Sequence, residues 1–283
     1  MTRGPIDLHT HSSVSDGTET PTQLIRAAVE AGLDTVAITD HDSTAGWDEA
    51  LTAAAGTGLQ VIRGIELSTR HEWRSVHLLG YLFDPHDPVI LRETARTRDD
   101  RLTRAERMVA RLAEDFDITW DDVLAQSGGT TIGRPHIADA LVARGVVPTR
   151  SAAFESILHF RGGYYLPHEA PTVLDGVRMI AEAGGAPVLA HPATRGREAV
   201  VDGADLGRLV DAGLVGLEVG HRENTPDGQA RLLELAAQYD LVVAGSSDYH
   251  GEGKPNRLAE NTTTPEALER LIAATRGVPP VRA

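Results

Sequence analysis

Short apolar runs alternate with amphipathic stretches along most of the chain, a pattern typical of strands that alternate with helices. The first helix should begin after Thr20, where Thr-Pro-Thr-Gln supplies an N-cap, a proline at the first helical position and a glutamine three residues on. Gly32 should end it. Seven strands are predicted, at residues 6–10, 34–40, 59–68, 76–83, 186–191, 215–220 and 241–248. Further helices are predicted at 46–55, 172–183, 205–212 and 226–238, and a last one after residue 264.

The alternation stops between residues 89 and 175, where no strand is predicted. Residues 89–116 combine helical periodicity with dense charge, and RPHIADALVARG and SAAFESILHF are typical of shorter helices. We therefore expect three parts: the first part of a barrel (1–88), a helical insertion that binds substrate or phosphate (89–175), and the second part of the barrel (176–283). The strand count favours an α/β barrel related to the (β/α)8 type but one strand short, although an open sheet would give a similar pattern.

Composition narrows the class of protein. The absence of cysteine excludes disulfides, zinc–thiolate sites, iron–sulfur clusters and thiol nucleophiles, and it favours a cytoplasmic location. No apolar run approaches the length of about 18 residues that a membrane span needs, and MTRGPIDLHT lacks the apolar core of a signal peptide. A net charge of −14 and an aromatic content of 4% argue against a surface for duplex DNA or long single strands. No obligate protein partner is evident.

Histidine and acidic side chains recur where the predicted strands end. His9 and His11 of DLHTHSSVSDG point to the same face of a strand, because side chains alternate along it. In barrel enzymes the active site lies at the carboxyl ends of the strands. One such residue could simply cap a strand or pack in the core, but this many are improbable by chance. The full set is His9, His11, Asp16, Asp40, His41, Glu66, His77, His191, Asp248 and His250.

Imidazole and carboxylate ligands without sulfur suit Mn²⁺, Fe²⁺ or Zn²⁺, with Mg²⁺ also acceptable. So many ligands exceed the needs of one ion, and we expect two or three. Glu66 is the expected bridge between two ions about 3.5–4 Å apart, which would lower the pKa of a shared water and supply hydroxide as the nucleophile. Amidohydrolases of the urease kind often use a carbamylated lysine as the bridge, at a strand end in the middle of the barrel. The only lysine here, Lys254, follows the last strand, so this bridge is excluded. The sequence therefore argues against amide or lactone hydrolysis.

The ordered motifs DLHTHSSVSDG, AITDHD, GIELS, VHLLGY, VLAHP and SSDYH closely resemble the PHP superfamily, named for polymerase and histidinol phosphatase. The resemblance covers residues 5–83 and 184–257, and it implies a distorted (β/α)7 barrel with a trinuclear phosphoesterase site, Mn²⁺ being the preferred ion. Carried over by motif, it implies one ion on His9, His11, Glu66 and Asp248, a second on Glu66, His77 and His191, and a third on Asp16, His41 and His250. Asp40 has no ligand role in this scheme, and we interpret it as orienting a histidine by a hydrogen bond.

Three further segments, TIGRPHIADAL, YYLPHEAP and EVGHRENT, resemble the PHP subgroup that acts on AMP, on 3′,5′-bisphosphonucleotides and on the 5′ end of short RNA. This resemblance implies that Arg134 and His136 clasp a phosphate and that His221 faces the metals. A guanidinium group suits the role because it binds phosphate oxygens in pairs. Alternatively, Arg-Pro-His only begins a helix, a position that also binds phosphate.

Other residues are weaker candidates for substrate binding. Arg161, His168 and Lys254 could contact substrate, but each could equally be a surface charge. Tyr164 or Tyr165 could stack on a base, or pack in a core.

The expected chemistry is direct hydrolysis. A metal-bound hydroxide would attack phosphorus in line while the metals take up charge on the phosphoryl oxygens. His221 or a metal-bound water would protonate the leaving ribose oxygen. The catalytic set would be Asp16, His41, His191, His221 and Arg134.

We therefore expect a nucleotide phosphoesterase that acts on AMP or on bisphosphates such as pAp. It would also act as a 5′→3′ exoribonuclease if short RNA enters the site. The alternatives are a phosphatase of small metabolites such as histidinol phosphate, and a non-catalytic PHP module that binds metal or nucleotide.

Overall fold

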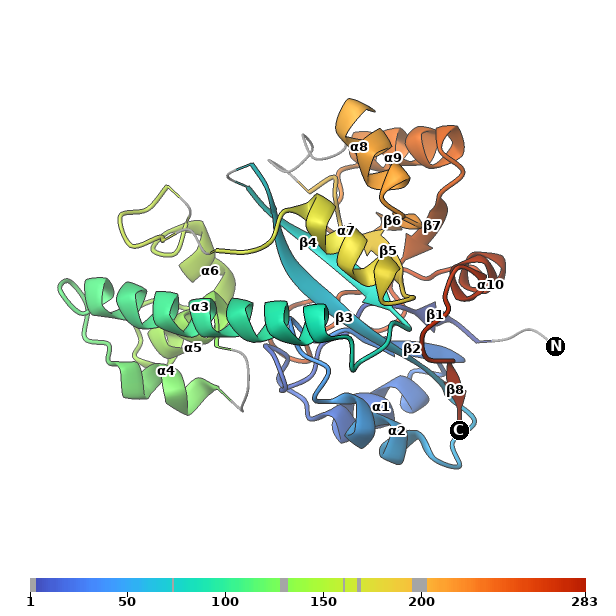
Figure 1. Ribbon diagram of the computed structural model, residues 1–283. Helices are drawn as coiled ribbons and strands as arrows, with labels where there is room; N and C mark the ends of the chain where they lie inside the picture. Colours follow the sequence, from blue (N-terminus) through green and yellow to red (C-terminus); the bar gives the residue numbers. More distant parts are fainter. Residues whose placement is uncertain (1–3, 73, 128–131, 160, 167–168, 195–202) are drawn as a thin grey trace.

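The computed structural model describes residues 4–72, 74–127, 132–159, 161–166, 169–194 and 203–283 (Figure 1). Seven strands form one nearly closed sheet in the order in which they occur along the chain, which confirms the prediction of an α/β fold of the distorted (β/α)7 barrel type. A short eighth strand near the C-terminus pairs with the third and was not predicted. The strands are β1 Ile6–Asp7, β2 Thr35–Ile38, β3 Gln60–His71, β4 Arg74–Tyr81, β5 Ala186–Leu189, β6 Gly216–Gly220, β7 Val242–Gly245 and β8 Val281–Arg282.

One strand of the barrel runs in the opposite direction to its neighbours. β4 pairs antiparallel with both β3 and β5, whereas the other neighbouring strands from β1 to β7 are parallel. A hairpin, in which His71 pairs with Arg74, replaces the helix that would otherwise connect the two strands. Since β4 is reversed, His77 in its first half lies opposite Ser68 near the end of β3. His77 therefore reaches the same rim as the residues that end the parallel strands.

Helices cover the outside of the sheet (Figure 1). The start predicted for the first of them is confirmed: the hydroxyl of Thr20 accepts a hydrogen bond from Gln23 N at 3.2 Å, and the Gln23 side chain accepts one from Thr20 N at 2.8 Å. The covering helices are α1 Pro21–Glu30, α2 Trp47–Ala54, α7 Val173–Glu182, α8 Gly203–Asp211, α9 Pro226–Gln238 and α10 Pro265–Ala273.

Inside the sheet, the buried Tyr81 hydroxyl donates a hydrogen bond to the carbonyl of Leu8 at 2.8 Å, so even the polar atom of this large side chain is satisfied.

Four helices between β4 and α7 lie to one side of the barrel (Figure 1). They are α3 Pro88–Leu112, α4 Trp120–Gln126, α5 Arg134–Ala143 and α6 Arg150–Glu155. These helices enclose a hydrophobic cluster of their own, whereas Val173 and Val177 of α7 pack with the barrel. Among the described residues, no helix combines the length and the apolar character that a membrane span requires, α3 with its seven arginines included.

The separate cluster of the helical segment generates a stability prediction. Replacing the fully buried Leu141 by alanine leaves a cavity among tightly packed helices, and we expect the free energy of unfolding to fall by about 2–5 kcal/mol. Urea denaturation followed by circular dichroism measures the change. Leu124→Ala is the matched control: this side chain is 42% exposed on α4, and its removal should cost less than about 0.5 kcal/mol. Equal losses in the two variants would contradict the packing described.

Candidate metal centre and anion-binding cavity

Four side chains from distant parts of the sequence converge at the rim of the barrel. His9 and His11 follow β1, Glu66 lies on β3 and Asp248 follows β7. The two Nε2 atoms are 3.0 Å apart, 3.3 and 3.1 Å from Glu66 Oε2, and 3.4 and 3.3 Å from Asp248 Oδ1. Ligands with bonds of about 2.1 Å to one ion lie about 3.0 Å apart in an octahedron and about 3.4 Å apart in a tetrahedron. The four residues predicted to share one ion are therefore spaced like the ligands of one ion.

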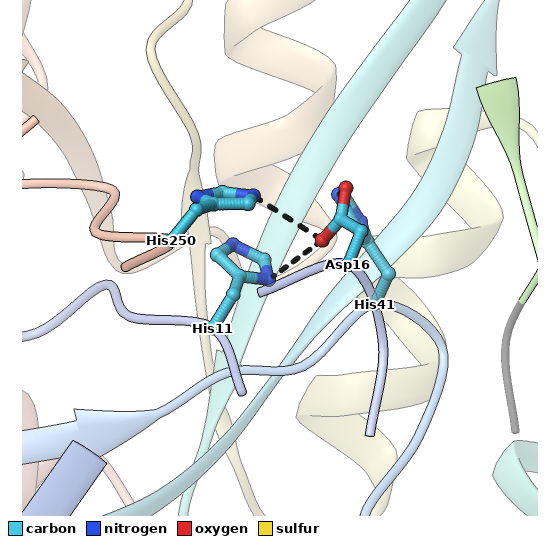
Figure 2. A group of neighbouring side chains, drawn as sticks. All are labelled: His11, Asp16, His41 and His250. Carbon is cyan, nitrogen blue, oxygen red and sulfur yellow. Dashed lines mark ion pairs between the residues drawn. The ribbon is translucent and has the colours of Figure 1, made fainter. Parts of the chain in front are cut away.

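A second group surrounds Asp16 (Figure 2). Asp16 Oδ1 lies 3.2 Å from His250 Nε2 and 3.6 Å from His11 Nδ1, and Oδ2 lies 3.8 Å from His41 Nε2. The rings of His11 and His250 stack with centroids 4.1 Å apart. The structure thus brings together Asp16, His41 and His250, as the sequence predicts, and adds His11, which faces this group with one ring nitrogen and the first group with the other.

Glu66 lies at the centre of the third group. Its Oε1 is 2.7 Å from His77 Nδ1 and 3.3 Å from His191 Nε2, while its Oε2 is 3.2 Å from His41 Nδ1. The two oxygens of one carboxylate thus face different sets of histidines, which is the geometry expected of a residue that bridges two ions. The structure brings together the predicted set of Glu66, His77 and His191.

The buried carboxylates depend on the surrounding positive charge. Burial raises the pKa of the Glu66 carboxyl, but the histidines that face it, led by His41, outweigh burial and hold it well below its usual range. The same balance lowers the pKa of Asp16, mainly through His250, and of Asp248, mainly through Lys254. Divalent cations could supply this charge in place of protons.

Buried ring nitrogens provide a further test of whether the residues fit metal ions. Within the described part of the chain, His77 Nδ1 and His250 Nε2 are buried and make no hydrogen bond, although each lies close to a carboxylate oxygen. A buried polar atom without a hydrogen bond is costly, and coordination of an ion would satisfy it. The imidazole and carboxylate donors, without sulfur, fit two or three ions such as Mn²⁺, Fe²⁺ or Zn²⁺.

The backbone is strained at this rim. Asp42, His191 and Asp248 have φ angles of 50°, 31° and 54°, in a region that non-glycine residues seldom adopt. Such conformations cost about 1–3 kcal/mol each and persist only where the surroundings enforce them. Two of the three residues belong to the predicted ligand set, so part of the strained backbone of the protein lies where ligands must be aimed.

Sequence reasoning missed the buried Glu218 on β6. Its Oε1 lies 2.9 Å from His9 Nδ1, and its Oε2 accepts a hydrogen bond from the backbone N–H of His191 at 2.7 Å. If His9 Nδ1 donates to this carboxylate, His9 Nε2 keeps its lone pair toward the first group. A carboxylate inside the apolar strand run VGLEVG was the available signal.

Among the described residues, Asp40 reaches a histidine through Ser15, whose hydroxyl lies 3.4 Å from His11 Nδ1. Its Oδ1 accepts hydrogen bonds from Ser12 N at 2.8 Å and Ser15 Oγ at 2.7 Å, and its Oδ2 accepts one from Ser12 Oγ at 2.7 Å. These bonds fix the loop that leads to Asp16. Asp40 therefore fixes the loop that carries Asp16, and its bond to Ser15 connects it to the ring of His11.

A link between α3 and the barrel was also missed. The Asp42 carboxylate accepts hydrogen bonds from the backbone N–H and hydroxyl of Ser68 at 2.7 and 2.6 Å, and it pairs with Arg101 Nε at 2.9 Å. Arg98 donates to the Asp42 carbonyl at 2.5 Å. Because Asp42 directly follows His41, the middle of α3 is fastened to the metal rim.

A cavity of about 260 Å³ opens beside the rim. Its acidic lining residues include Asp16, Glu66 and Asp248, and five cations also line it. The cations are Arg101 and Arg104 of α3, Arg134 of α5, Arg150 of α6, and Lys254. Of these five, only Arg134 and Lys254 were candidates for substrate binding from the sequence. The amine of Lys254 lies 2.7 Å from Asp248 Oδ2.

The remaining candidates have different surroundings. His221 reaches the centre, with Nε2 at 3.5 Å from Asp248 Oδ2. His136 is buried, accepts a hydrogen bond from Gly133 N at 3.1 Å and lines the neighbouring groove. Arg161 is exposed and is not among the residues that line the cavity. His168 lies outside the described residues.

The two tyrosines point to different surroundings. The hydroxyl of Tyr164 donates to Asp115, and its ring packs against Phe116 in the helical segment. The ring of Tyr165 instead lies against the guanidinium groups of Arg104 and Arg134.

Comparison with known proteins agrees with this geometry. Residues 7–118 match the family model described as PHP domain. The chain is 34% identical over 255 residues to the phosphoribosyl 1,2-cyclic phosphate 1,2-diphosphodiesterase of Eggerthella lenta, covering 87% of this chain and 94% of that protein. It is 34% identical over 273 residues to the 3′,5′-nucleoside bisphosphate phosphatase of Chromobacterium violaceum, covering 91% of each. A 5′-3′ exoribonuclease, Rnm of Salmonella typhimurium, is 32% identical over 248 residues, with 86% and 84% covered.

Two crystallised proteins are similar over nearly their whole length. A protein of Bifidobacterium adolescentis described as a metal-dependent phosphoesterase superposes with a TM-score of 0.93 at 45% identity, covering 98% of each chain. A Chromobacterium violaceum protein described as an amidohydrolase, with bound sulfate and no metal, superposes with a TM-score of 0.87 at 30% identity, covering 99% of this chain and 98% of that one.

The contacts of Glu218 predict its effect on metal binding. In Glu218→Gln an amide group must face two N–H donors and the negative charge is lost, so we expect the affinity for Mn²⁺ to fall about 10- to 100-fold. Competition with a fluorescent chelator measures the affinity. Glu234→Gln, the same change at an exposed position of α9, should leave it unaltered. Wild-type affinity in Glu218→Gln would show that Glu218 does not support the ligands.

Proposed function

The chain belongs to the PHP family, and from this premise we propose that it is a metal-dependent phosphoesterase that hydrolyses nucleotide phosphates. The observation that carries the proposal is the arrangement of charge around one small cavity. Glu66, surrounded by histidines, lines this cavity together with five cationic side chains. A phosphate ester could place its reacting phosphorus at the histidine side while other anionic groups meet the cations.

We propose that three ions, Mn²⁺ in the first place, occupy the three groups. The ligands would be His9, His11, Glu66 and Asp248 for one ion, Glu66, His77 and His191 for another, and Asp16, His41 and His250 for the third. When bound, such ions lower the pKa of a coordinated water toward neutrality and neutralise charge on the phosphoryl oxygens.

The side chains of the protein would bind and orient the substrate and move one proton. Arg134, the first residue of α5, would hold phosphate oxygens with its planar donors, next to the N-terminus of the helix. His221 Nε2 faces Asp248 and would carry the proton that the leaving ribose oxygen receives. Lys254, beside Asp248, would add positive charge close to the reacting phosphate.

The size of the cavity favours small substrates. About 260 Å³ suits a mononucleotide or the terminal nucleotide of a short RNA rather than a long polymer. Among the relatives, the Chromobacterium violaceum enzyme is named for 3′,5′-nucleoside bisphosphates and Rnm for 5′-3′ exoribonuclease activity. We propose 3′,5′-bisphosphonucleotides as the preferred substrates, because one phosphate would engage the histidines of the cavity and the other its cations.

We also propose that the helical segment within 89–175 acts as the substrate-binding subdomain. The absence of cysteine supports the further proposal that the protein acts in the cytoplasm.

Substrate hydrolysis tests the proposed function directly. With Mn²⁺ the protein should release phosphate from adenosine 3′,5′-bisphosphate or AMP, and EDTA should abolish release. His191→Ala removes a proposed ligand and should lower kcat/KM about 100-fold or more. The control His86→Ala changes an exposed histidine ahead of α3 and should behave as wild type.

A 5′-phosphorylated RNA trimer and histidinol phosphate complete the panel of substrates. Preferential cleavage of histidinol phosphate would indicate a metabolite phosphatase, and metal binding without any hydrolysis would indicate a binding module.

The position of Arg134 predicts that its substitution weakens substrate binding more than it slows the chemical step. Arg134→Ala should raise KM for adenosine 3′,5′-bisphosphate about 10- to 100-fold with a smaller change in kcat, because charge-assisted hydrogen bonds to the substrate are lost. Steady-state kinetics with Mn²⁺ measures both constants. Arg161→Ala removes an exposed arginine of the same helical segment and should leave KM within about twofold. A larger effect of Arg161→Ala than of Arg134→Ala would reverse this assignment.

A further inference from the structure

Two aromatic rings lie against the cations at the mouth of the cavity. The guanidinium carbon of Arg134 is 5.3 Å from the centre of the Phe154 ring and 5.3 Å from that of the Tyr165 ring. The guanidinium carbon of Arg104 is also 5.3 Å from the centre of the Tyr165 ring. Phe154 lies on α6, Arg134 on α5 and Arg104 on α3. The contacts therefore connect four separate parts of the helical segment into one array.

The array brings two positive charges to one ring. The guanidinium groups of Arg104 and Arg134 repel each other, and the negative face of an aromatic ring attracts both. Burial lowers the pKa of Arg104 to about 10, so this group still carries its charge at neutral pH. Arg104 is fixed in addition by a hydrogen bond from its Nε to the carbonyl of Leu166. Tyr165 thus lies against two cations that line the cavity, one of which is also hydrogen-bonded to the backbone.

A long side chain such as arginine samples many rotamers, and ordering it on binding reduces affinity. A guanidinium group held against aromatic rings keeps its plane and its edge in one orientation, ready for paired hydrogen bonds to an anion. The arrangement also gives Tyr165 a use other than stacking on a base.

We propose that Phe154 and Tyr165 are positioning residues that hold the guanidinium of Arg134 for an anionic group of the substrate. The proposal rests on the proposed function for the identity of that anion, a phosphate group of a nucleotide. Neither ring needs to touch the substrate for this role. The prediction is that two uncharged side chains control the affinity for a charged ligand.

Binding to the full-length protein without metal tests this separately from catalysis. Titration calorimetry with adenosine 3′,5′-bisphosphate in EDTA reports on the cationic side of the cavity, independently of turnover. Phe154→Leu and Tyr165→Leu should each raise Kd about 2- to 30-fold, the range of cation–π contributions. Tyr164→Leu is the matched control, since the neighbouring tyrosine contacts Asp115 and Phe116 instead, and it should leave Kd within about twofold. Thermal unfolding of each variant confirms that it folds.

A double-mutant cycle shows whether Phe154 acts through Arg134. If it does, Phe154→Leu should raise Kd in the wild-type background but change it less than twofold in Arg134→Ala. The same effect in both backgrounds would mean that Phe154 contacts the nucleotide itself, which would overturn the proposal. With Mn²⁺, both ring variants should raise KM and leave kcat within about threefold, and Tyr165→Phe should restore KM because the ring is retained.

Three other outcomes would also test the positioning role of Phe154 and Tyr165. Unchanged Kd in both ring variants, or an equal rise in Tyr164→Leu, would overturn the positioning role. A protein that binds the bisphosphate and responds to the ring variants, but hydrolyses no phosphate ester, would disprove the proposed function and leave the positioning role intact.

Discussion

The carboxylate of Glu66 is the constraint on which the site depends. It is buried at the centre of the rim, and histidines from β4 and from the segments after β1, β2 and β5 face its two oxygens. A buried negative charge in this position requires hydrogen-bond donors or positive charges around it, so each surrounding strand must bring its histidine to the same rim of the barrel. The nearly closed sheet meets that requirement, and the strained backbone at Asp42, His191 and Asp248 shows that local geometry yields to it.

The barrel and the helical segment contribute different charges. The barrel supplies the acidic and imidazole side of the cavity, and α3, α5 and α6 supply four of its five cations. The protein as a whole carries a net charge of −14, yet four arginines and the single lysine line the cavity where an anion would enter. Local placement of charge, rather than net charge, therefore makes an acidic protein able to attract a phosphate ester.

The sequence revealed most of the fold, because strand ends and helix caps are local signals. The Thr20 cap and the seven strands are examples, and the resemblance to the PHP superfamily implied that His9, Glu66 and Asp248 lie together. The direction of β4 could not be read, because a hydrophobic run looks the same in either direction. The role of Asp42 depends on a partner 59 residues away, Arg101, and no local pattern encodes such a pairing. Likewise, Tyr165 looks the same in sequence whether it meets a base or an arginine.

The bonds from Arg98 and Arg101 to Asp42 bear on how this protein could be recombined with its relatives. A chimera whose incoming helical segment lacked arginines in the places of Arg98 and Arg101 would leave a buried aspartate without its counter-charge. The helices between β4 and α7 are thus not an interchangeable cassette. The unit of exchange includes the loop after β2, so a change of specificity in this architecture carries part of the metal site with it.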